Sequence, residues 1–87
     1  MTVAQMWEAR AVDGRAGELS SWVREFVLPA LRGSAGLVRT ELFAAPGDRV
    51  LLITWWQDAD PVPVADPPAG LLARPVHRWG FTSEHVE

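Results

Sequence analysis

His77 is the first side chain to consider for chemistry, because few groups in this chain titrate near neutral pH. The 87 residues include two His and no Cys. A neutral imidazole can serve as a general base or as a haem ligand. The alternative is a strand His that is hydrogen-bonded at the rim of a pocket. His85 lies in a polar tail, and the two His do not have a zinc-site spacing. We therefore take His77 as the catalytic candidate and expect no metal site.

Tryptophan is the second unusual feature, with five Trp and no Tyr. Trp offers a large rigid surface that stacks on flat ligands or fills a core. We expect Trp7 and Trp56 to form the walls of a substrate pocket, and Trp22 and Phe26 to form its roof. Core packing is the competing interpretation for all four. A flat aromatic ligand is the chemistry that such walls would favour.

The strand that positions these groups is the segment 49–58, in which alternate residues point to opposite faces. Both faces are apolar, so both must be covered. An 87-residue chain has little material for covering two faces. We therefore predict that a second copy of the chain covers the back face, which makes a homodimer. The predicted dimer interface consists of Leu51, Ile53 and Trp55.

The rest of the chain is predicted to form three further strands and two helices around this strand. We predict strands over 2–11, 36–43 and 76–82, and a helix that begins at Asp13 as N-cap and ends at Gly33. Its apolar stripe includes Trp22 and Phe26, and Pro29 should kink or loosen its end. Four prolines in 60–68 exclude a regular helix there, and a short helix should follow over 69–74.

This order of elements predicts a ferredoxin-like α+β sandwich, βαββαβ, with a four-stranded antiparallel sheet. In that topology the first and third strands are central, which suits the apolar segment 49–58. We expect one domain over residues 1–87, with 83–87 as a polar tail. A hairpin should join the second and third strands through the turn at 44–48.

Composition excludes several classes of function. The formal net charge is −3 and no basic stripe is present, so we expect no nucleic acid partner. The first residues have neither a basic segment nor a long apolar segment, so no signal peptide is predicted. No apolar run is long enough for a membrane span. We expect a cytoplasmic protein without a membrane partner. No Gly-x-Ser-x-Gly elbow or phosphate-binding loop occurs.

The chain resembles the antibiotic biosynthesis monooxygenase family of the dimeric α+β barrel proteins. The resemblance spans about Met6 to Phe81. It is carried by the helix end and following strand at 28–43, the strand at 49–58 and the closing segment 74–79. The NIPSNAP-like proteins share the proline-ended first helix and are a related alternative. The resemblance implies a homodimer whose two sheets close a barrel, with a pocket between the sheet and the helices of each subunit.

The family's chemistry transfers only in part. Some members oxidise aromatic polyketides with O₂ and no cofactor, and Trp56 matches a Trp that these members have late in the third strand. Leu52 stands where they have an Asn that could stabilise a developing anion. Other members bind and degrade haem. Trp7 stands about where they have an Asn, and His77 lies slightly beyond the place of their axial His.

Our leading hypothesis is a monooxygenase-like enzyme that acts on a small aromatic or polycyclic substrate without a cofactor. His77 would be the base, and Trp7 and Trp56 the walls. A dimer that binds a small molecule or haem without turnover is the first alternative. A structural partner module, whose pocket is filled by its own side chains, is the second. We expect a small hydrophobic or aromatic ligand in the first two cases.

Overall fold

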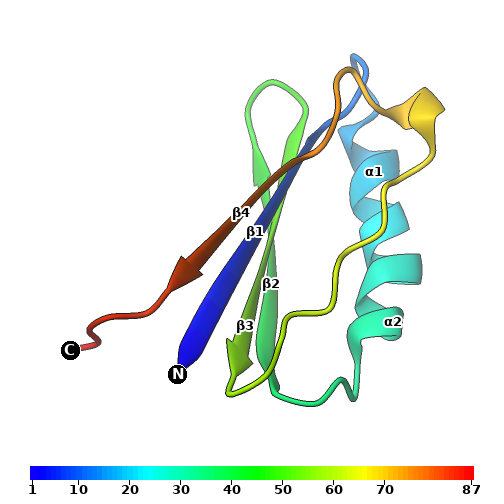
Figure 1. The fold of residues 1–87 in the computed structure, drawn as a ribbon. Coiled ribbons are helices and arrows are strands. Elements are labelled where there is room, and N and C mark those ends of the chain that lie inside the picture. The colour runs from blue at the N-terminus through cyan, green and yellow to red at the C-terminus, as the bar shows by residue number, and fades with distance from the viewer.

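The structure is a computed structural model that describes all 87 residues. Its four strands form one sheet, and one interrupted helix and one short 3-10 turn lie on one side of it (Figure 1). In chain order, the elements are β1 (Thr2–Arg10), α1 (Ala16–Trp22), η1 (Val23–Val27), α2 (Leu28–Leu31), β2 (Leu37–Ala45), β3 (Arg49–Gln57), η2 (Ala69–Leu71) and β4 (His77–Thr82).

The strands form one antiparallel sheet in the order β2-β3-β1-β4. β1 and β3 are therefore the central strands, as the sequence predicts. In the register of the sheet, Trp7 of β1 lies opposite Leu52 of β3 on one side and Arg78 of β4 on the other. The predicted ferredoxin-like α+β fold is confirmed. It is the arrangement expected from two split βαβ units, although the second unit has almost no helix.

The core lies between the sheet and the helix. On β3, Val50, Leu52, Thr54 and Trp56 face this side and are fully buried. From β1, Trp7 and Ala9 join the same cluster. This face follows the alternation predicted for the segment 49–58.

The helix changes its winding partway along, because η1 is a π-helical segment between α1 and α2. Pro29 follows directly, and its ring would crowd the carbonyl four residues earlier in a regular helix. The wider turn relieves that crowding, which is the loosening that the sequence predicts at this proline. Gly33, at φ 78°, follows the last turn as the terminating residue. The predicted N-cap is wrong: Asp13 lies in the preceding turn, and α1 begins after Arg15 without a side-chain cap.

The buried stripe of the helix differs from the predicted one. The buried residues recur every four positions, namely Leu19, Val23, Val27 and Leu31. In a regular α-helix such a series rotates by about 40° per step, and the π-helical segment offsets part of that drift. Phe26 consequently turns away from the sheet and is 62% exposed. The prediction that Phe26 belongs to the buried stripe is therefore wrong.

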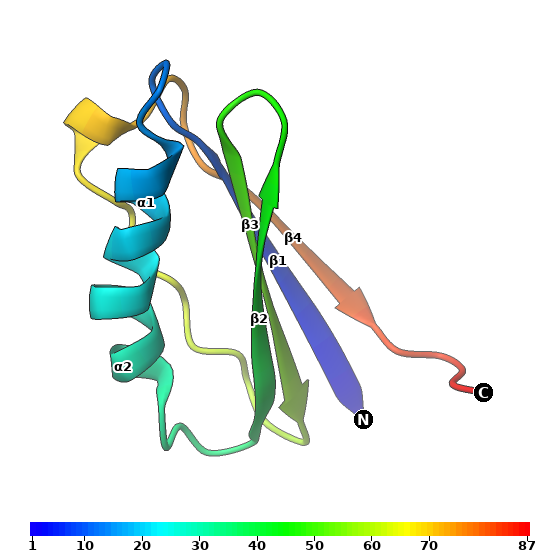
Figure 2. The same ribbon diagram turned by 180° about the vertical axis from the view of Figure 1, so that it is seen from behind.

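An extended segment, Asp60–Pro68, takes the place of the second helix, and we call it the proline strap. The helix predicted over 69–74 is reduced to the 3-10 turn η2 at Ala69–Leu71. Both ribbon views place the strap on the same side of the sheet as the helix (Figures 1 and 2). The opposite face of the sheet carries no element of this chain (Figure 2). None of the helices has both the length and the hydrophobicity that crossing a bilayer requires.

Candidate functional site

A cleft lies between the proline strap and the strands β1 and β4. Its volume is about 210 Å³. This is somewhat larger than a cavity of about 150 Å³ that holds one benzene ring in another protein. The lining combines apolar strap residues with polar groups of the sheet: Gln5, Met6, Trp7, Pro61, Val62, Pro63, Val64 and Arg78. A substituted single ring or two fused rings match this space.

Trp7 forms the inner wall of the cleft. Its side chain is 3% exposed and stacks on Trp22 of the helix, with ring centroids 6.4 Å apart and an interplanar angle of 22°. Its Nε1 is the one buried side-chain polar atom that has no hydrogen-bond partner. Burying an N–H donor without a partner has a free-energy cost. Trp7 thus lines a cleft under the strap and not the pocket predicted between the sheet and the first helix, and its role in substrate binding stays a prediction.

Arg78 holds the strap against the sheet. Its Nη2 donates to the carbonyl oxygen of Val64 at 2.9 Å and to Oδ1 of Asp66 at 2.6 Å. The side chain is 45% exposed, and its Nε and Nη1 take part in neither bond. The guanidinium is a rigid fork of donors, so fixing one nitrogen also orients the others. Arg78 thus lines the cleft, binds the strap and leaves donors free for a ligand.

Three backbone hydrogen bonds hold the chain just outside the two ends of the strap. At its start, the amide of Gln57 donates to the carbonyl of Gly36 at 2.7 Å, just before the chain turns into the strap. At its end, the amide of Val12 donates to the carbonyl of Leu71, and that of Ala73 donates to the carbonyl of Arg10, both at 2.9 Å. The chain is therefore held on both sides of the strap, and Arg78 binds the strap itself.

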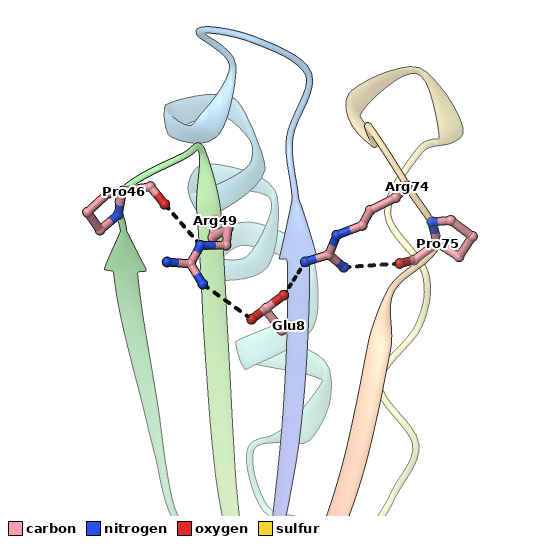
Figure 3. A network of polar contacts seen from close by, with 5 residues as sticks. All are labelled: Glu8, Pro46, Arg49, Arg74 and Pro75. Carbon is pink, nitrogen blue, oxygen red and sulfur yellow. Dashed lines mark hydrogen bonds and ion pairs between the residues drawn. The ribbon is translucent and has the colours of Figure 1, made fainter.

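A partly buried ion-pair network fixes the segment that leads from the strap into β4 (Figure 3). Glu8 of β1 accepts a hydrogen bond from Arg74 and lies 3.9 Å from Nη1 of Arg49. Arg49 also donates to the carbonyl of Pro46 at 2.9 Å, in the β2–β3 turn. The Glu8 side chain is 19% exposed, so these contacts are more shielded than ordinary surface pairs. One carboxylate thus connects the hairpin turn, β1 and the start of β4.

The other predicted pocket residues on the helix side do not line the cleft. Trp56 is fully buried, and its Nε1 donates to Oγ1 of Thr54 at 2.9 Å. Trp22 lies between Trp7 and Phe26, with its ring 6.4 Å from each. None of the cavities in the structure is lined by Trp22, Trp56 or Phe26. The pocket predicted between the sheet and the first helix is therefore filled, and the cleft lies beside it under the strap.

His77 lies on the opposite face of the sheet from this cleft. It pairs with Glu8 in the β1–β4 ladder, next to the Trp7–Arg78 pair, and neighbouring residues of a strand point to opposite faces. Its ring packs edge-on against Trp79 at 5.6 Å. The two residues line a shallow hollow on the open face. The prediction that places His77 at the mouth of the same pocket as Trp7 is wrong, and its catalytic role stays a prediction.

The residues predicted for a dimer interface lie together on the open face. Leu51, Ile53 and Trp55 alternate with the buried residues of β3, and Arg39 lies over the Trp55 ring at 4.3 Å. Large apolar side chains of the other strands extend this face and remain exposed: Phe43, Trp79 and Phe81. The geometry agrees with an interface, and the dimer itself stays a prediction.

The residues present do not fit a haem or a multidentate metal site. A haem macrocycle has four pyrrole rings, whereas the cleft is only slightly larger than a cavity that holds one benzene ring. The one His of the strands, His77, lies on the other face of the sheet. No group of three or more His, Cys, Asp or Glu side chains gathers in a way that could hold a metal ion.

The fold resembles two solved structures over nearly the whole chain. Rv0793 from Mycobacterium tuberculosis superposes with a TM-score of 0.70 at 15% identity, covering 99% of this chain and 98% of its own. A protein described as a candidate antibiotic biosynthesis monooxygenase from Chloroflexus aurantiacus J-10-fl superposes with a TM-score of 0.52, with the same identity and coverages. No protein-family model matches the sequence, and neither does any curated protein.

The class that these observations define is a ferredoxin-like α+β domain with the fold of an antibiotic biosynthesis monooxygenase-like protein. The predicted resemblance is confirmed for the fold. At 15% identity it does not carry residue roles or a substrate.

Sequence reasoning missed Arg78, Gln5 and the strap as parts of the site. Alternation places Arg78 on the opposite face of its strand from His77 and Trp79, and the pairing with Trp7 of β1 shows that this is the face toward the helix. The strap was recognised only as a segment without a helix. Its prolines indicate an extended chain, and an extended chain above a sheet can form one wall of a cleft.

Proposed function

We propose that this protein binds a small aromatic molecule in the cleft under the proline strap and oxidises it as a monooxygenase-like enzyme without a cofactor. The observation that carries the proposal is a preformed cleft of about 210 Å³ with an aromatic inner wall, Trp7, and a cationic end, Arg78. Small-molecule sites are typically concave and apolar with a few polar groups. The fold shared with the Chloroflexus protein supports the reaction class.

The chemistry needs an electron-rich substrate that ionises when it binds. The positive charge of Arg78 would favour a phenolate or enolate over the neutral form. Such an anion can itself supply all four electrons that O₂ takes up when its ring carbon is oxidised to a carbonyl: one oxygen atom becomes the new C=O of a quinone or ketone, and the other leaves as water with the two hydrogens that the substrate loses. The chain's contributions are to orient the ring against Trp7, stabilise the anion and exclude water.

Binding without turnover is the second candidate function, and one observation favours it. The residues that line the cleft include no His, Asp or Glu, so no side chain there can remove a proton at neutral pH. His77 cannot act on a ligand in this cleft from the other face of the sheet. A substrate that ionises readily would still react, whereas a weaker acid would only bind.

The first test measures ligand binding and O₂ uptake on the same samples. Two-ring phenols should quench Trp fluorescence saturably, and ionised ones should consume O₂. Arg78→Met should weaken binding, whereas His77→Ala should leave both readouts unchanged because it lies outside the cleft. Binding without O₂ uptake would support the binding protein over the enzyme. A loss of O₂ uptake in His77→Ala would place the chemistry on the open face and contradict the proposal.

We also propose that the protein is a homodimer joined through its open sheet face. The support is the exposed apolar surface there, which includes Phe81 at 52% and Trp79 at 44% exposure. Phe81→Glu places a charge that an isolated protomer tolerates, so it should leave the fold intact and produce a monomer in sedimentation. Phe26→Glu is the matched control, because Phe26 is also exposed, at 62%, but lies on the helix. A monomeric wild-type protein would refute the dimer.

A further inference from the structure

We infer that the proline strap is a lid over the cleft and that Arg78 is the contact that holds it closed. This inference rests on the proposed function, because the lid controls access to the same cleft, and it adds a step of opening and closing to it. Strap residues form one wall of the cleft, and Trp7 belongs to the sheet side of it. A movement of the strap therefore changes both the cleft and the burial of Trp7.

The strap makes very few backbone hydrogen bonds. Four of the residues in 60–68 are prolines, which have no N–H. None of the other amides of the strap donates a hydrogen bond, and only the carbonyls of Val64 and Pro68 accept one. The strands beneath it are instead paired along their length. Segments with few backbone hydrogen bonds open at a lower free energy than paired ones, so the strap can open while the sheet stays folded.

Arg78 is the one polar attachment of the strap to the sheet. Its Nη2 donates to two acceptors on the strap, the carbonyl of Val64 and the carboxylate of Asp66. Apolar contacts add to it, because Val64 packs against the core and Pro67 is buried. The part of the strap that lines the cleft is less buried, and Val62 is 43% exposed. Opening the lid therefore requires the loss of the Arg78 contacts and of little other polar interaction.

The chain outside the strap is fixed, which confines the movement to the strap. The amides of Gln57 and Ala73, before and after it, donate to backbone carbonyls at 2.7 and 2.9 Å. Prolines restrict the backbone and favour an extended segment, so bending concentrates at its two ends. The chain changes direction at these ends, at Asp58 with a φ of 50° and at the 3-10 turn η2. Hinges are typically a few such residues at the ends of elements.

The lid couples ligand binding to closure. A ligand contacts two walls of the cleft when the strap is closed and only the sheet when it is open, so it must favour the closed state. Arg78 strengthens this coupling, because its Nε and Nη1 are not used by the strap. An acceptor that meets these nitrogens orients the rigid guanidinium and thereby also the Nη2 that binds the strap.

Exchange of the indole N–H of Trp7 with deuterated water, followed by NMR, measures the opening. This N–H is buried and has no hydrogen-bond partner, so its exchange requires only a movement that admits water. The indole N–H of Trp56 is the internal reference, because it is buried in the core and bonded to Thr54. Arg78→Met should accelerate exchange at Trp7 about tenfold, since a hydrogen bond to a charged group has about that effect. Exchange at Trp56 should not change.

Two further variants separate the lid from general destabilisation. Arg39→Met is the matched control, because the exposed Arg39–Glu41 pair lies on the open face, and it should leave exchange at Trp7 unchanged. Asp66→Asn removes only the charged partner on the strap, so it should accelerate Trp7 less than Arg78→Met does, and it replaces that variant if Arg78→Met does not fold. Unchanged exchange at Trp7 in both strap variants would overturn the inference. Equal acceleration at Trp7 and Trp56 would also overturn it, because the whole core would then be opening.

A ligand provides the converse test. Saturating 2-naphthol should slow exchange at Trp7 in the wild-type protein, because the bound state is the closed one. Binding of 2-naphthol, seen as fluorescence quenching, without slower exchange at Trp7 would overturn the lid while leaving the proposed binding function intact. Failure of 2-naphthol and other two-ring phenols to bind would refute the proposed function, whereas the exchange rates of the variants would still decide whether Arg78 holds the strap closed.

Discussion

Gly36 is the residue at which a single added methyl group should most disturb the turn from β3 into the strap. Its φ is 80°, in the left-handed region that favours glycine. A Cβ there would lie 2.4 Å from Cβ of Ala59 and 2.8 Å from the carbonyl oxygen of Gln57. Both neighbours belong to the segment in which β3 turns into the strap. Gly33 is the natural control, because it has almost the same φ, 78°, and nothing within 4 Å of the added Cβ.

The two substitutions should therefore differ by the cost of the steric clash alone. Left-handed backbone costs a non-glycine residue about 1–2 kcal/mol, so Gly33→Ala should lower the free energy of unfolding by about that amount. Overpacking adds about 1–3 kcal/mol, which brings the expected loss for Gly36→Ala to about 2–5 kcal/mol. The Gln57 oxygen is part of the backbone and the Ala59 side chain has no rotamer freedom, so the clash requires a shift of the strap itself.

Urea denaturation followed by circular dichroism measures both losses under the same conditions. Because the strap moves, Gly36→Ala should also weaken the binding of two-ring phenols, whereas Gly33→Ala should not. Equal stability losses, within about 0.5 kcal/mol, would refute the close approach of Gly36 to Ala59. A destabilised Gly36→Ala protein with unchanged ligand affinity would show that the turn from β3 into the strap does not position the cleft.

Two further predictions concern the helix. Phe26→Ala should lower the free energy of unfolding by less than about 1 kcal/mol, because the ring is exposed. Leu19→Ala, at a fully buried position, should lower it by about 2–5 kcal/mol. Similar losses for the two variants in urea denaturation would contradict the observed buried stripe. The hydrogen bond from Arg15 holds the pKa of Glu18 below its ordinary value. The pair therefore stabilises the fold fully when the pH lies above the pKa of Glu18 in the unfolded chain. This stabilisation disappears as the pH falls through the lower pKa of the folded state. Glu18→Gln should therefore lower the urea midpoint slightly at about pH 7 and leave it unchanged at about pH 2, and a difference that persists in acid would show that the ion pair is not its cause.

The strands were predictable because their signal is periodic and strong. The alternation of apolar residues through 49–58 correctly placed Trp56 on the core side and Trp55 on the open side. The order of elements then determined that this strand is central. In the last strand, alternation places His77 and Arg78 on opposite faces, but only the register with β1 shows that Arg78, and not His77, shares the face of Trp7.

The helix and the cleft were less predictable because each depends on a local departure from regular geometry. A stripe drawn with 3.6 residues per turn includes Phe26, and only the π-helical turn before Pro29 moves Phe26 out of it. The unpaired Nε1 of Trp7 has no signal in the sequence, because its burial results from contacts between β1, the helix and the strap. Hydrophobic periodicity reports which face a residue occupies, not which of its atoms finds a partner.

The cleft follows from the replacement of a helix by prolines. A helix with its side chains is about 10–12 Å wide, and in this topology it would cover β1 and β4 beside the first helix. The proline strap is a single extended chain and covers less of the sheet. Prolines also have no N–H, so the strap needs fewer hydrogen bonds, and its Val64 carbonyl is satisfied by Arg78. The residue that compensates for the missing helix is thus also the cationic group of the cleft. Both strap contacts of Arg78 come from Nη2, so its Nε and Nη1 can meet a ligand while the strap stays in place.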